Sequence, residues 1–318
     1  MTNSLVSVII PVYNAADVIS ATLDGVRQQS YQNWELVVVE DGSDTPSDHI
    51  VRQFASTQAG HRVEYIANSS NKGQAVSRNV GIEQAKGDFI ALLDADDIWL
   101  PDYLSSQVGL LQEPGADIVF STVSLFDSNS KAEIGFWGPS AEELENFQAS
   151  IIRRNFIAPS ATVFRREVFD MVGQFDPDTS IQGTEDYDFF LRALLYKQCF
   201  VHSDEIHCLY RKSHPGAATS NMPLIKKRSC TVIERHIDRL SDVSKKTKKR
   251  LLAARLYESA LANLESDPNY AKNALHKGWR LNPVNLKPLL VQLSLKLPSK
   301  LRTQVRHVYR KLSIRSAE

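Results

Sequence analysis

Strand-like runs alternate with helix-compatible stretches through the first hundred residues, and this alternation constrains the fold more than any other feature. The strand-like runs lie at residues 6–10, 36–39, 63–66 and 89–93, and the helical stretches include residues 15–29 and 74–86. Nearly continuous apolar runs are typical of strands covered on both faces, and Pro11 is expected to end the first run. Alternation of strands and helices places such strands in a parallel sheet. The sequence therefore predicts an α/β fold with a mostly parallel sheet and helices on both faces.

The run at residues 89–93 ends in a cluster of acidic residues. Asp94, Asp96 and Asp97 follow it, and no lysine or arginine occurs between positions 86 and 131. Side chains two apart in an extended chain point the same way, so Asp94 and Asp96 repel each other, whereas Asp97 is interpreted as a turn or helix-start acceptor. Mg²⁺ or Mn²⁺, shared with a substrate phosphate, relieves such repulsion. Open α/β sheets bind ligands at this end of their strands, so the cluster predicts a metal–diphosphate site.

The familiar nucleotide-binding motifs are absent. None of the 14 glycines forms G-x-G-x-x-G, and G-x-x-x-x-G-K-[ST] does not occur, which argues against dinucleotide dehydrogenases and P-loop enzymes. A diphosphate therefore needs other partners. Arg78, within the helix predicted after residues 71–73, can supply one through a charge-assisted contact.

The formal net charge of zero hides a strong asymmetry. Residues 1–221 contain 15 Lys/Arg against 30 Asp/Glu, a net of −15, whereas residues 222–318 contain 22 against 7, a net of +15. The change predicts a boundary between an acidic domain and a basic, helical C-terminal extension. Within the extension, residues 299–315 place an apolar stripe between basic flanks. Such a segment suits either docking on the catalytic domain or lying on an anionic membrane, and no motif supports nucleic-acid binding.

Cysteine content and hydropathy favour a cytoplasmic chain. Cys199, Cys208 and Cys230 are odd in number and lack metal-ligand spacing, so they are interpreted as reduced, buried thiols. The N-terminal residues carry no basic n-region, and no apolar run has the length that a bilayer requires. The expected location is the cytoplasm, with the basic extension able to hold the protein at the inner face of the membrane.

Several sequence blocks occur in the order that is typical of one enzyme family. Those of the first half are residues 8–14 (VIIPVYN), 40–44 (EDGSD), 71–81 (NKG followed by RNVG) and 93–97 (LDADD). Those of the second half are residues 164–169 (FRREVF), 173–176 (GQFD) and 185–189 (EDYDF). Together they resemble a family 2 glycosyltransferase with the GT-A fold, over roughly residues 5–215. The resemblance implies a nucleotide-sugar-binding half at residues 5–120 and an acceptor half at residues 121–221.

The resemblance also implies how the donor is bound. Asp41 would read the nucleobase, for which a carboxylate is suited because it accepts the imide N–H of uracil. On turn chemistry alone, Asp41 can equally form an Asx-turn, and Lys72 can be a solvated loop cation. The full set of implied donor-binding residues is Pro11, Tyr13, Asn14, Asp41, Lys72, Arg78, Asp94 and Ala95.

The second acid of Glu185-Asp186 is the implied general base. On the helix predicted to begin near Glu185, Asp188 and Arg192 stand four apart and can pair on the outer face, whereas Asp186 shares the inner face with Phe190. The residues alone also allow simple stabilisation of the helix N-terminus by both acids. In the family, this aspartate removes the proton from the acceptor hydroxyl as it attacks the anomeric carbon with inversion.

The metal site implied by the resemblance uses Asp94 and Asp96, with Mg²⁺ or Mn²⁺ as the cofactor. His214 would close over the metal or the diphosphate, although a loop histidine with an ordinary hydrogen bond is the alternative. The expected partners are a nucleotide-sugar donor, a glycan or lipid-linked acceptor and an anionic membrane surface. Residues 136–138 (FWG) can offer an aromatic platform to an acceptor sugar or simply pack.

Two other functions remain compatible with the residues. A sugar nucleotidyltransferase also uses an α/β domain and a metal, but its glycine-rich, arginine-bearing N-terminal loop is missing. A carbohydrate-binding or scaffold protein on a transferase fold would not need the acids at positions 94, 96 and 186.

Overall fold

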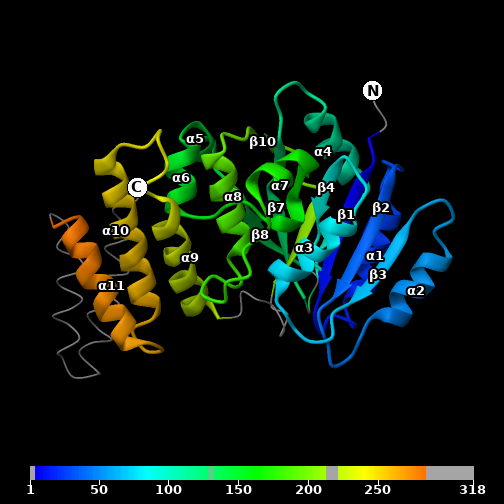
Figure 1. The fold of residues 1–318 in the computed structure, drawn as a ribbon, viewed down its shortest axis with the longest axis horizontal. Coiled ribbons are helices and arrows are strands. Elements are labelled where there is room, and N and C mark those ends of the chain that lie inside the picture. Colours follow the sequence, from blue (N-terminus) through cyan, green and yellow to red (C-terminus); the bar gives the residue numbers. More distant parts are fainter. Residues whose placement is uncertain (1–3, 129, 131, 213–220, 284–318) are drawn as a thin grey trace. The chain divides into compact units, whose positions relative to one another are not determined.

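The computed structural model of the 318-residue chain describes residues 4–128, 130, 132–212 and 221–283. The chain divides into two compact units, residues 1–221 and residues 222–318. This division falls at the position where the sequence changes from acidic to basic. The first unit is α/β and the described part of the second is helical (Figure 1).

A seven-stranded sheet forms the centre of the first unit. In spatial order its strands are β10 (Phe200–Ser203), β6 (Ile118–Ser121), β9 (Thr162–Arg165), β4 (Phe89–Leu92), β1 (Val6–Val12), β2 (Trp34–Glu40) and β3 (Val63–Ala67). Neighbouring strands run parallel except at β9, which is antiparallel to both β4 and β6. The predicted mostly parallel sheet is therefore confirmed. Pro11 does not end β1 but pairs with Val39 inside it.

Helices cover both faces of this sheet, as predicted. On one face, α1 (Ile19–Arg27), α2 (Asp48–Ser56) and α4 (Tyr103–Leu111) pack in one buried cluster with Val8 and Ile10 of β1. Because successive side chains of a strand point to opposite faces, Ile9 points to the other side. The two faces are therefore both apolar, which explains the nearly continuous apolar run in the sequence.

The opposite face carries α3 (Gln74–Gln84), α7 (Arg166–Val172) and α8 (Glu185–Leu195). Gly81 lets α3 approach the sheet closely, since a Cβ at this position would lie 2.6 Å from Cγ2 of Ile9. Aromatic side chains of α7 and α8 pack against each other and against β9. This packing places the amino end of α8 on the same side of the sheet as α3.

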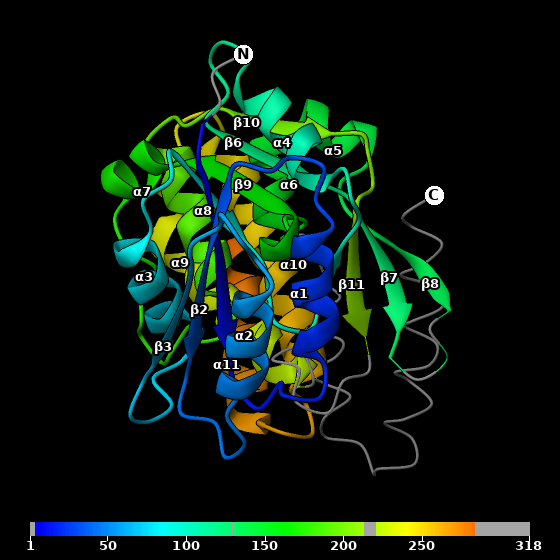
Figure 2. The ribbon, with the colours of Figure 1, turned by 90° about the vertical axis from the view of Figure 1, so that its right-hand side faces the viewer.

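A second, four-stranded sheet completes the first unit. Its spatial order is β5 (Ile98–Trp99), β11 (Cys208–Lys212), β7 (Val123–Asp127) and β8 (Glu133–Trp137). Figure 2 shows β11, β7 and β8 apart from the larger sheet. The remaining short helices of this unit are α5 (Ala141–Glu145), α6 (Phe147–Arg153) and the 3₁₀ turn at Pro159–Ala161.

The described part of the second unit contains three helices, α9 (Met222–His236), α10 (Lys245–Ala262) and α11 (Pro268–Leu281). Its core includes Ile233 of α9 and Leu256 of α10, which are 1% and 2% exposed. Among the described residues, no helix has both the length and the apolar character needed to cross a membrane.

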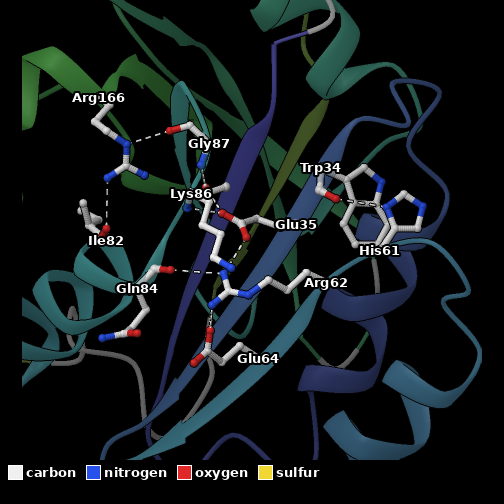
Figure 3. Close-up of polar contacts among 11 residues, drawn as sticks. Trp34, Glu35, His61, Arg62, Glu64, Ile82, Gln84, Lys86, Gly87 and Arg166 are labelled. Atoms are coloured by element: carbon white, nitrogen blue, oxygen red, sulfur yellow. Dashed lines mark hydrogen bonds and ion pairs between the residues drawn. The ribbon is translucent and has the colours of Figure 1, made fainter.

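Polar groups tie together the amino ends of β1, β2 and β3 (Figure 3). Glu35 is 2% exposed and accepts hydrogen bonds from Ser7 Oγ at 2.5 Å and from the main-chain N–H of Lys86. Arg62 places Nη1 2.6 Å from Oε2 of Glu35 and pairs through Nη2 with Glu64. We call these five residues the amino-edge cluster. Burial raises the pKa of Glu35, but the hydrogen bonds from Ser7, Lys86 and Arg62 outweigh burial, and the net pKa is lowered.

Candidate active site

Most of the predicted site residues gather at the carboxyl ends of β1, β2 and β4. In the strand register, Val12 of β1 lies beside Glu40 of β2, and Ile9 of β1 lies beside Leu92 of β4. The residues that follow these strands therefore share one edge of the sheet. Open α/β sheets bind their ligands at this edge.

A buried arginine links the acidic run after β4 to the amino end of α8. Arg78 on α3 is 1% exposed, and its Nη2 lies 2.8 Å from Oδ1 of Asp94. Its Nη1 lies 2.8 Å from Oε1 of Glu185. Burial alone would lower the pKa of Arg78, but the carboxylates of Asp94 and Glu185 raise it above the ordinary value. No lysine or arginine lies close to Asp94 in the sequence, and Arg78 of α3 supplies the missing positive charge.

This pairing gives Arg78 partners within the protein. Each terminal nitrogen of its guanidinium donates one hydrogen bond to a carboxylate and carries a second N–H group, so the diphosphate contact that the sequence suggested stays a prediction. The third nitrogen, Nε, is buried and has no acceptor within the part of the chain that the structure describes. Glu185, for which the sequence offered only helix stabilisation, is the other partner of this arginine.

The acidic run itself divides into two parts. Asp94 and Asp96 are partly exposed, whereas Asp97 is 1% exposed. Asp97 accepts hydrogen bonds from Ser160 Oγ at 2.5 Å and from the main-chain N–H of Arg211 at 2.8 Å. The interpretation of Asp97 as a turn or helix-start acceptor is therefore wrong, because its carboxylate ties the run to β11.

The pKa of Asp97 reports the charge of this region. Burial and then the charges of Asp96 and Asp94 raise the pKa of Asp97 well above the ordinary value. Tyr210 on β11 responds in the same direction, through burial and the nearby aspartates. After burial, the charges of Asp94 and Asp96 are thus what disfavours a further negative charge here, a condition that a bound cation would relieve.

Asp41 fixes the loop that leads into α3. It is 3% exposed, and its Oδ1 accepts hydrogen bonds from Asn68 Nδ2 and the N–H of Lys72, both at 2.9 Å. Its Oδ2 accepts the N–H of Gly73 at 2.8 Å. The side chain of Lys72 is exposed beside this loop. Asp41 therefore does not bond the residues that directly follow it, as an Asx-turn would require. It bonds a loop about 30 residues further along the chain.

The other predicted donor-binding residues occupy the same edge of the sheet. Pro11 is buried in β1, Tyr13 is 48% exposed, and Asn14 adopts φ of 48°. Asn14 Oδ1 accepts the N–H of Asp44 at 2.9 Å, which joins the segment after β1 to the segment after β2. Ala95 is buried, and its carbonyl accepts a hydrogen bond from α1.

Asp186 lies in the first turn of α8 and is partly exposed. Its Oδ2 accepts a hydrogen bond from Asn155 Nδ2 at 3.2 Å. Burial and then the neighbouring charge of Glu185 raise the pKa of Asp186 to about 7, against the opposing effect of Arg78. A carboxyl group with this pKa can accept a proton at neutral pH far more effectively than an ordinary aspartate.

The predicted ion pair between Asp188 and Arg192 is present at 2.8 Å. Asp188 is nevertheless 2% exposed and Arg192 only partly exposed, so this pair does not lie on the outer face of α8. Arg192 also donates to carbonyl groups at residues 172–174. These contacts fasten α8 to the loop after α7.

Asp94 and Asp96 fit a divalent ion that shares a diphosphate. Among the described residues, no three His, Cys, Asp or Glu side chains form a ready-made metal site. Mg²⁺, however, is commonly held by one or two carboxylates, with substrate phosphates and waters as the remaining ligands. Arg78 occupies Oδ1 of Asp94 and leaves the second oxygen to other partners. His214 lies outside the described residues.

A family model described as glycosyl transferase family 2 matches residues 7–173, which is more than half of the chain. The chain belongs to glycosyl transferase family 2. This is the family that the sequence blocks, among them those at residues 8–14 and 93–97, predicted.

Curated relatives of this family 2 chain include two bacterial proteins. One is the Escherichia coli UDP-Glc:alpha-D-GlcNAc-diphosphoundecaprenol beta-1,3-glucosyltransferase WfgD, 35% identical over 41% of this chain and 50% of that protein. Another is the putative teichuronic acid biosynthesis glycosyltransferase TuaG of Bacillus subtilis, 39% identical over 39% of this chain and 50% of that protein. The chain spans about half the length of these relatives.

Solved structures share the GT-A fold with this family 2 chain. The S. aureus TarS fragment 1–349 aligns with a TM-score of 0.63 at 20% identity, over 96% of this chain and 87% of that chain. It has also been solved with UDP-GlcNAc. The mannosyltransferase PcManGT from Pyrobaculum calidifontis, solved with GDP-Man and Mn²⁺, aligns with a TM-score of 0.58 at 21% identity, over 94% of this chain and 82% of that chain.

Proposed function

We propose that this chain is an inverting glycosyltransferase that moves a sugar from a UDP-sugar to a hydroxyl group of a glycan or lipid-linked acceptor. The observation that carries this proposal is the placement of Asp186, which follows Glu185 at the start of α8, while Glu185 is tied through Arg78 to Asp94. The raised pKa of Asp186 agrees with this placement. This arrangement thus combines a group able to accept a proton with a negatively charged site suited to a cation. A carbohydrate-binding scaffold would need neither group.

Asp186 is proposed as the general base. Above about pH 7 its carboxylate is deprotonated and can accept the proton of the acceptor hydroxyl as that oxygen attacks the anomeric carbon. The new bond forms on the face opposite the diphosphate, which leaves with both electrons of the broken bond. The hydrogen bond from Asn155 holds the carboxylate in one orientation.

Asp94 and Asp96 are the residues proposed to hold a divalent ion, either Mg²⁺ or Mn²⁺. When bound, such an ion offsets the charge that develops on the leaving diphosphate. PcManGT, which has the same fold, contains Mn²⁺ together with its nucleotide-sugar. His214 is proposed as a third contact to the metal or diphosphate.

The nucleotide is proposed to lie against the segments that follow β1 and β2. Asp41 would read the base, and its bonds to residues 68–73 keep this loop in place around the nucleotide. Pro11, Tyr13 and Asn14 would frame the base, and Ala95 would lie beside the diphosphate. The exposed side chain of Lys72 is free to turn toward a bound anion.

The relatives and the charge of the second unit support a proposal for the acceptor and the cellular location. The name of WfgD gives its acceptor as a sugar linked to diphosphoundecaprenol, which is a lipid-linked acceptor. The second unit of this chain exposes Lys245, Lys246, Lys249 and Arg250 at the start of α10. We propose that these cations, together with residues 299–318 outside the described part, hold a cytoplasmic enzyme at the anionic inner face of the membrane.

Donor screening tests the main proposal. Thermal shift with UDP-, GDP- and dTDP-sugars, with and without Mn²⁺, should show stabilisation by one UDP-sugar that depends on the metal. Release of UDP in the presence of a hydroxyl acceptor should follow. A protein that binds a sugar but shows no turnover with any nucleotide-sugar would instead be a scaffold.

Vesicle sedimentation tests the location. The chain should sediment with anionic phospholipid vesicles at low salt and be released at high salt, because the Debye length falls from about 30 Å at 0.01 M to about 3 Å at 1 M. Replacement of the four α10 cations by glutamine should weaken this binding. Full-length protein that ignores anionic vesicles at low salt would contradict the proposed membrane attachment.

A further inference from the structure

Glu185 precedes the proposed base in the sequence, and its buried side chain points toward Arg78. It is 2% exposed, and both of its carboxylate oxygens are occupied. Oε1 receives Arg78 Nη1 at 2.8 Å, and Oε2 receives the main-chain N–H of Gly183 at 2.6 Å. The first turn of α8 and the loop before it are therefore held by one carboxylate.

Arg78 carries this attachment to the acidic run. Its second terminal nitrogen bonds Asp94, so a single side chain joins α3, the segment after β4 and the start of α8. The residues joined are 16 and 107 positions away from Arg78 in the sequence. The neighbouring Asn79 attaches α3 to the segment after α7 as well. Its side chain donates one hydrogen bond to the carbonyl of Phe175 and accepts one from the N–H of Phe175, each at 2.8 Å.

Stability alone does not account for this arrangement. A buried ion pair costs desolvation energy, and well-packed apolar side chains of similar volume often stabilise a protein as well or better. Here one arginine faces two carboxylates, which leaves excess negative charge, and its buried Nε has no acceptor within the described residues. Native cores rarely keep such a donor without a reason.

We propose that Glu185 is a positioning residue that acts through Arg78. It holds Asp94 and the first turn of α8 at a fixed separation. The carboxyl group of Asp186, which accepts the proton, and that of Asp94, which faces the diphosphate, therefore keep a constant distance from each other. This inference rests on the proposed function, because it assigns Asp186 to the acceptor side and Asp94 to the donor side. Displacement of reacting groups by about 1 Å can cost about 10²-fold in rate, which gives the linkage a measurable consequence.

Glu185→Gln tests the linkage, since glutamine keeps the shape of the side chain and removes its charge. We expect kcat for UDP release from the donor identified by screening to fall by about 10–10²-fold. The Kd for UDP with MnCl₂, measured by calorimetry, should change by less than about threefold. Glu185→Asp, which keeps the charge on a shorter side chain, should recover part of kcat.

Glu35→Gln in the amino-edge cluster is the matched control. Glu35 is also 2% exposed and paired to an arginine, but at the other end of the sheet. If Glu185 only stabilises the fold, both variants will lower the Tm while kcat per folded molecule stays unchanged, and the inference is overturned. A fall in kcat confined to Glu185→Gln supports it.

A double-mutant cycle between Glu185→Gln and Arg78→Lys identifies the route. If Glu185 acts through Arg78, the two effects on kcat will not multiply, because each breaks the same connection. Fully multiplicative effects would overturn the route through Arg78. Failure of the proposed function would instead appear in the wild-type chain, as a lack of UDP binding or of turnover.

Discussion

Two arginine–carboxylate clusters lie at opposite ends of the same strands and differ in how completely they are satisfied. In the amino-edge cluster, the buried Glu35 finds its partners within the chain, and its net pKa is lowered. The residues around the carboxyl ends of β1, β2 and β4, among them Asp94, Asp97, Arg78 and Asp186, form what we call the carboxyl edge. There, the pKa of Asp97 and that of Asp186 are both raised, and Arg78 keeps one buried nitrogen without an acceptor among the described residues. Similar side chains therefore produce a satisfied network within the five residues of the amino-edge cluster and spare bonding capacity around Arg78.

This difference in how well the charged groups are compensated indicates which end of the strands can bind a ligand and react. Groups that are already neutralised and hydrogen-bonded gain little from a ligand, so the amino-edge cluster serves the fold. Groups whose charge is only partly compensated gain from a cation or a proton, which is the condition that a metal–diphosphate site and a general base require. The following predictions test this contrast, from the largest expected effect to the smallest.

Asp96→Ala should have the largest effect and should reduce sugar transfer to background. The variant loses one of the two carboxylates proposed to hold the divalent ion, so binding of UDP should no longer depend on Mn²⁺. Calorimetry with and without the metal measures this loss, and circular dichroism should show an unchanged fold. Asp88→Ala, just before the same strand, serves as the control and should keep its activity. Near-normal transfer by Asp96→Ala, or by the wild type in excess chelator, would contradict the metal role.

Asp186→Asn should lower kcat by at least about 10²-fold while the Kd for UDP with MnCl₂ changes little. Wild-type kcat should rise with pH and level off above about 7, because only the deprotonated carboxylate accepts a proton. The residual rate of the variant should show no such rise. Collapse of donor affinity with intact turnover at saturation would place Asp186 in donor binding.

The same carboxyl group should also affect stability. Since folding raises the pKa of Asp186 from 3.8 to about 7, the folded protein binds this proton more tightly than the unfolded chain. The free energy of unfolding should therefore decrease as pH rises from about 4 to about 7. Asp186→Asn removes this dependence, so at pH 8 its Tm should be no lower than that of the wild type.

Glu35→Gln should behave in the opposite way and affect the fold more than the reaction. Loss of a buried, hydrogen-bonded charge should lower the free energy of unfolding by about 1–3 kcal/mol, while kcat stays within about twofold. Because folding lowers the pKa of Glu35, its stabilising effect is present above pH 4.5 and disappears as pH falls through the folded pKa. Urea titrations at pH 7 and pH 3 should show the variant and wild type converging in acid. A large loss of kcat would remove the distinction between the two edges.

Arg62→Lys should have the smallest effect. The Arg62 side chain is 31% exposed and contacts two carboxylates, and lysine can keep one of these contacts as a point charge. The expected loss is below about 1 kcal/mol, as is usual for partly exposed ion pairs, and kcat should not change. A loss as large as that of Glu35→Gln would show that the guanidinium itself holds the amino edge together.

Local patterns in the sequence were enough to predict most of the first sheet. The apolar run at residues 89–93 appears as β4, and the helix expected at residues 74–86 appears as Gln74–Gln84. The sequence blocks also located the acidic run and the Glu185-Asp186 pair. These features depend on periodicity and on residues adjacent in the chain, which a sequence displays directly.

Other features depended on which strands become neighbours. The antiparallel strand β9 lies between β4 and β6, and the second sheet brings β11 beside the acidic run. Asp97 thus bonds groups at positions 160 and 211, where the sequence suggested a local turn. Pro11 is likewise tolerated inside β1, although the sequence suggested that it ends the strand.

The sequence by itself determined the fold class, the family and the chemical types at the carboxyl edge. Only the tertiary structure decided their partners: Arg78 with Asp94 and Glu185, Asp41 with the loop at residues 68–73, and Asp186 with Asn155. The physical reason is that hydrophobic periodicity is a local property of the chain, whereas the pKa of a carboxyl group depends on burial and on charges a few ångströms away. Those charges come from distant positions in the sequence, and folding alone brings them together.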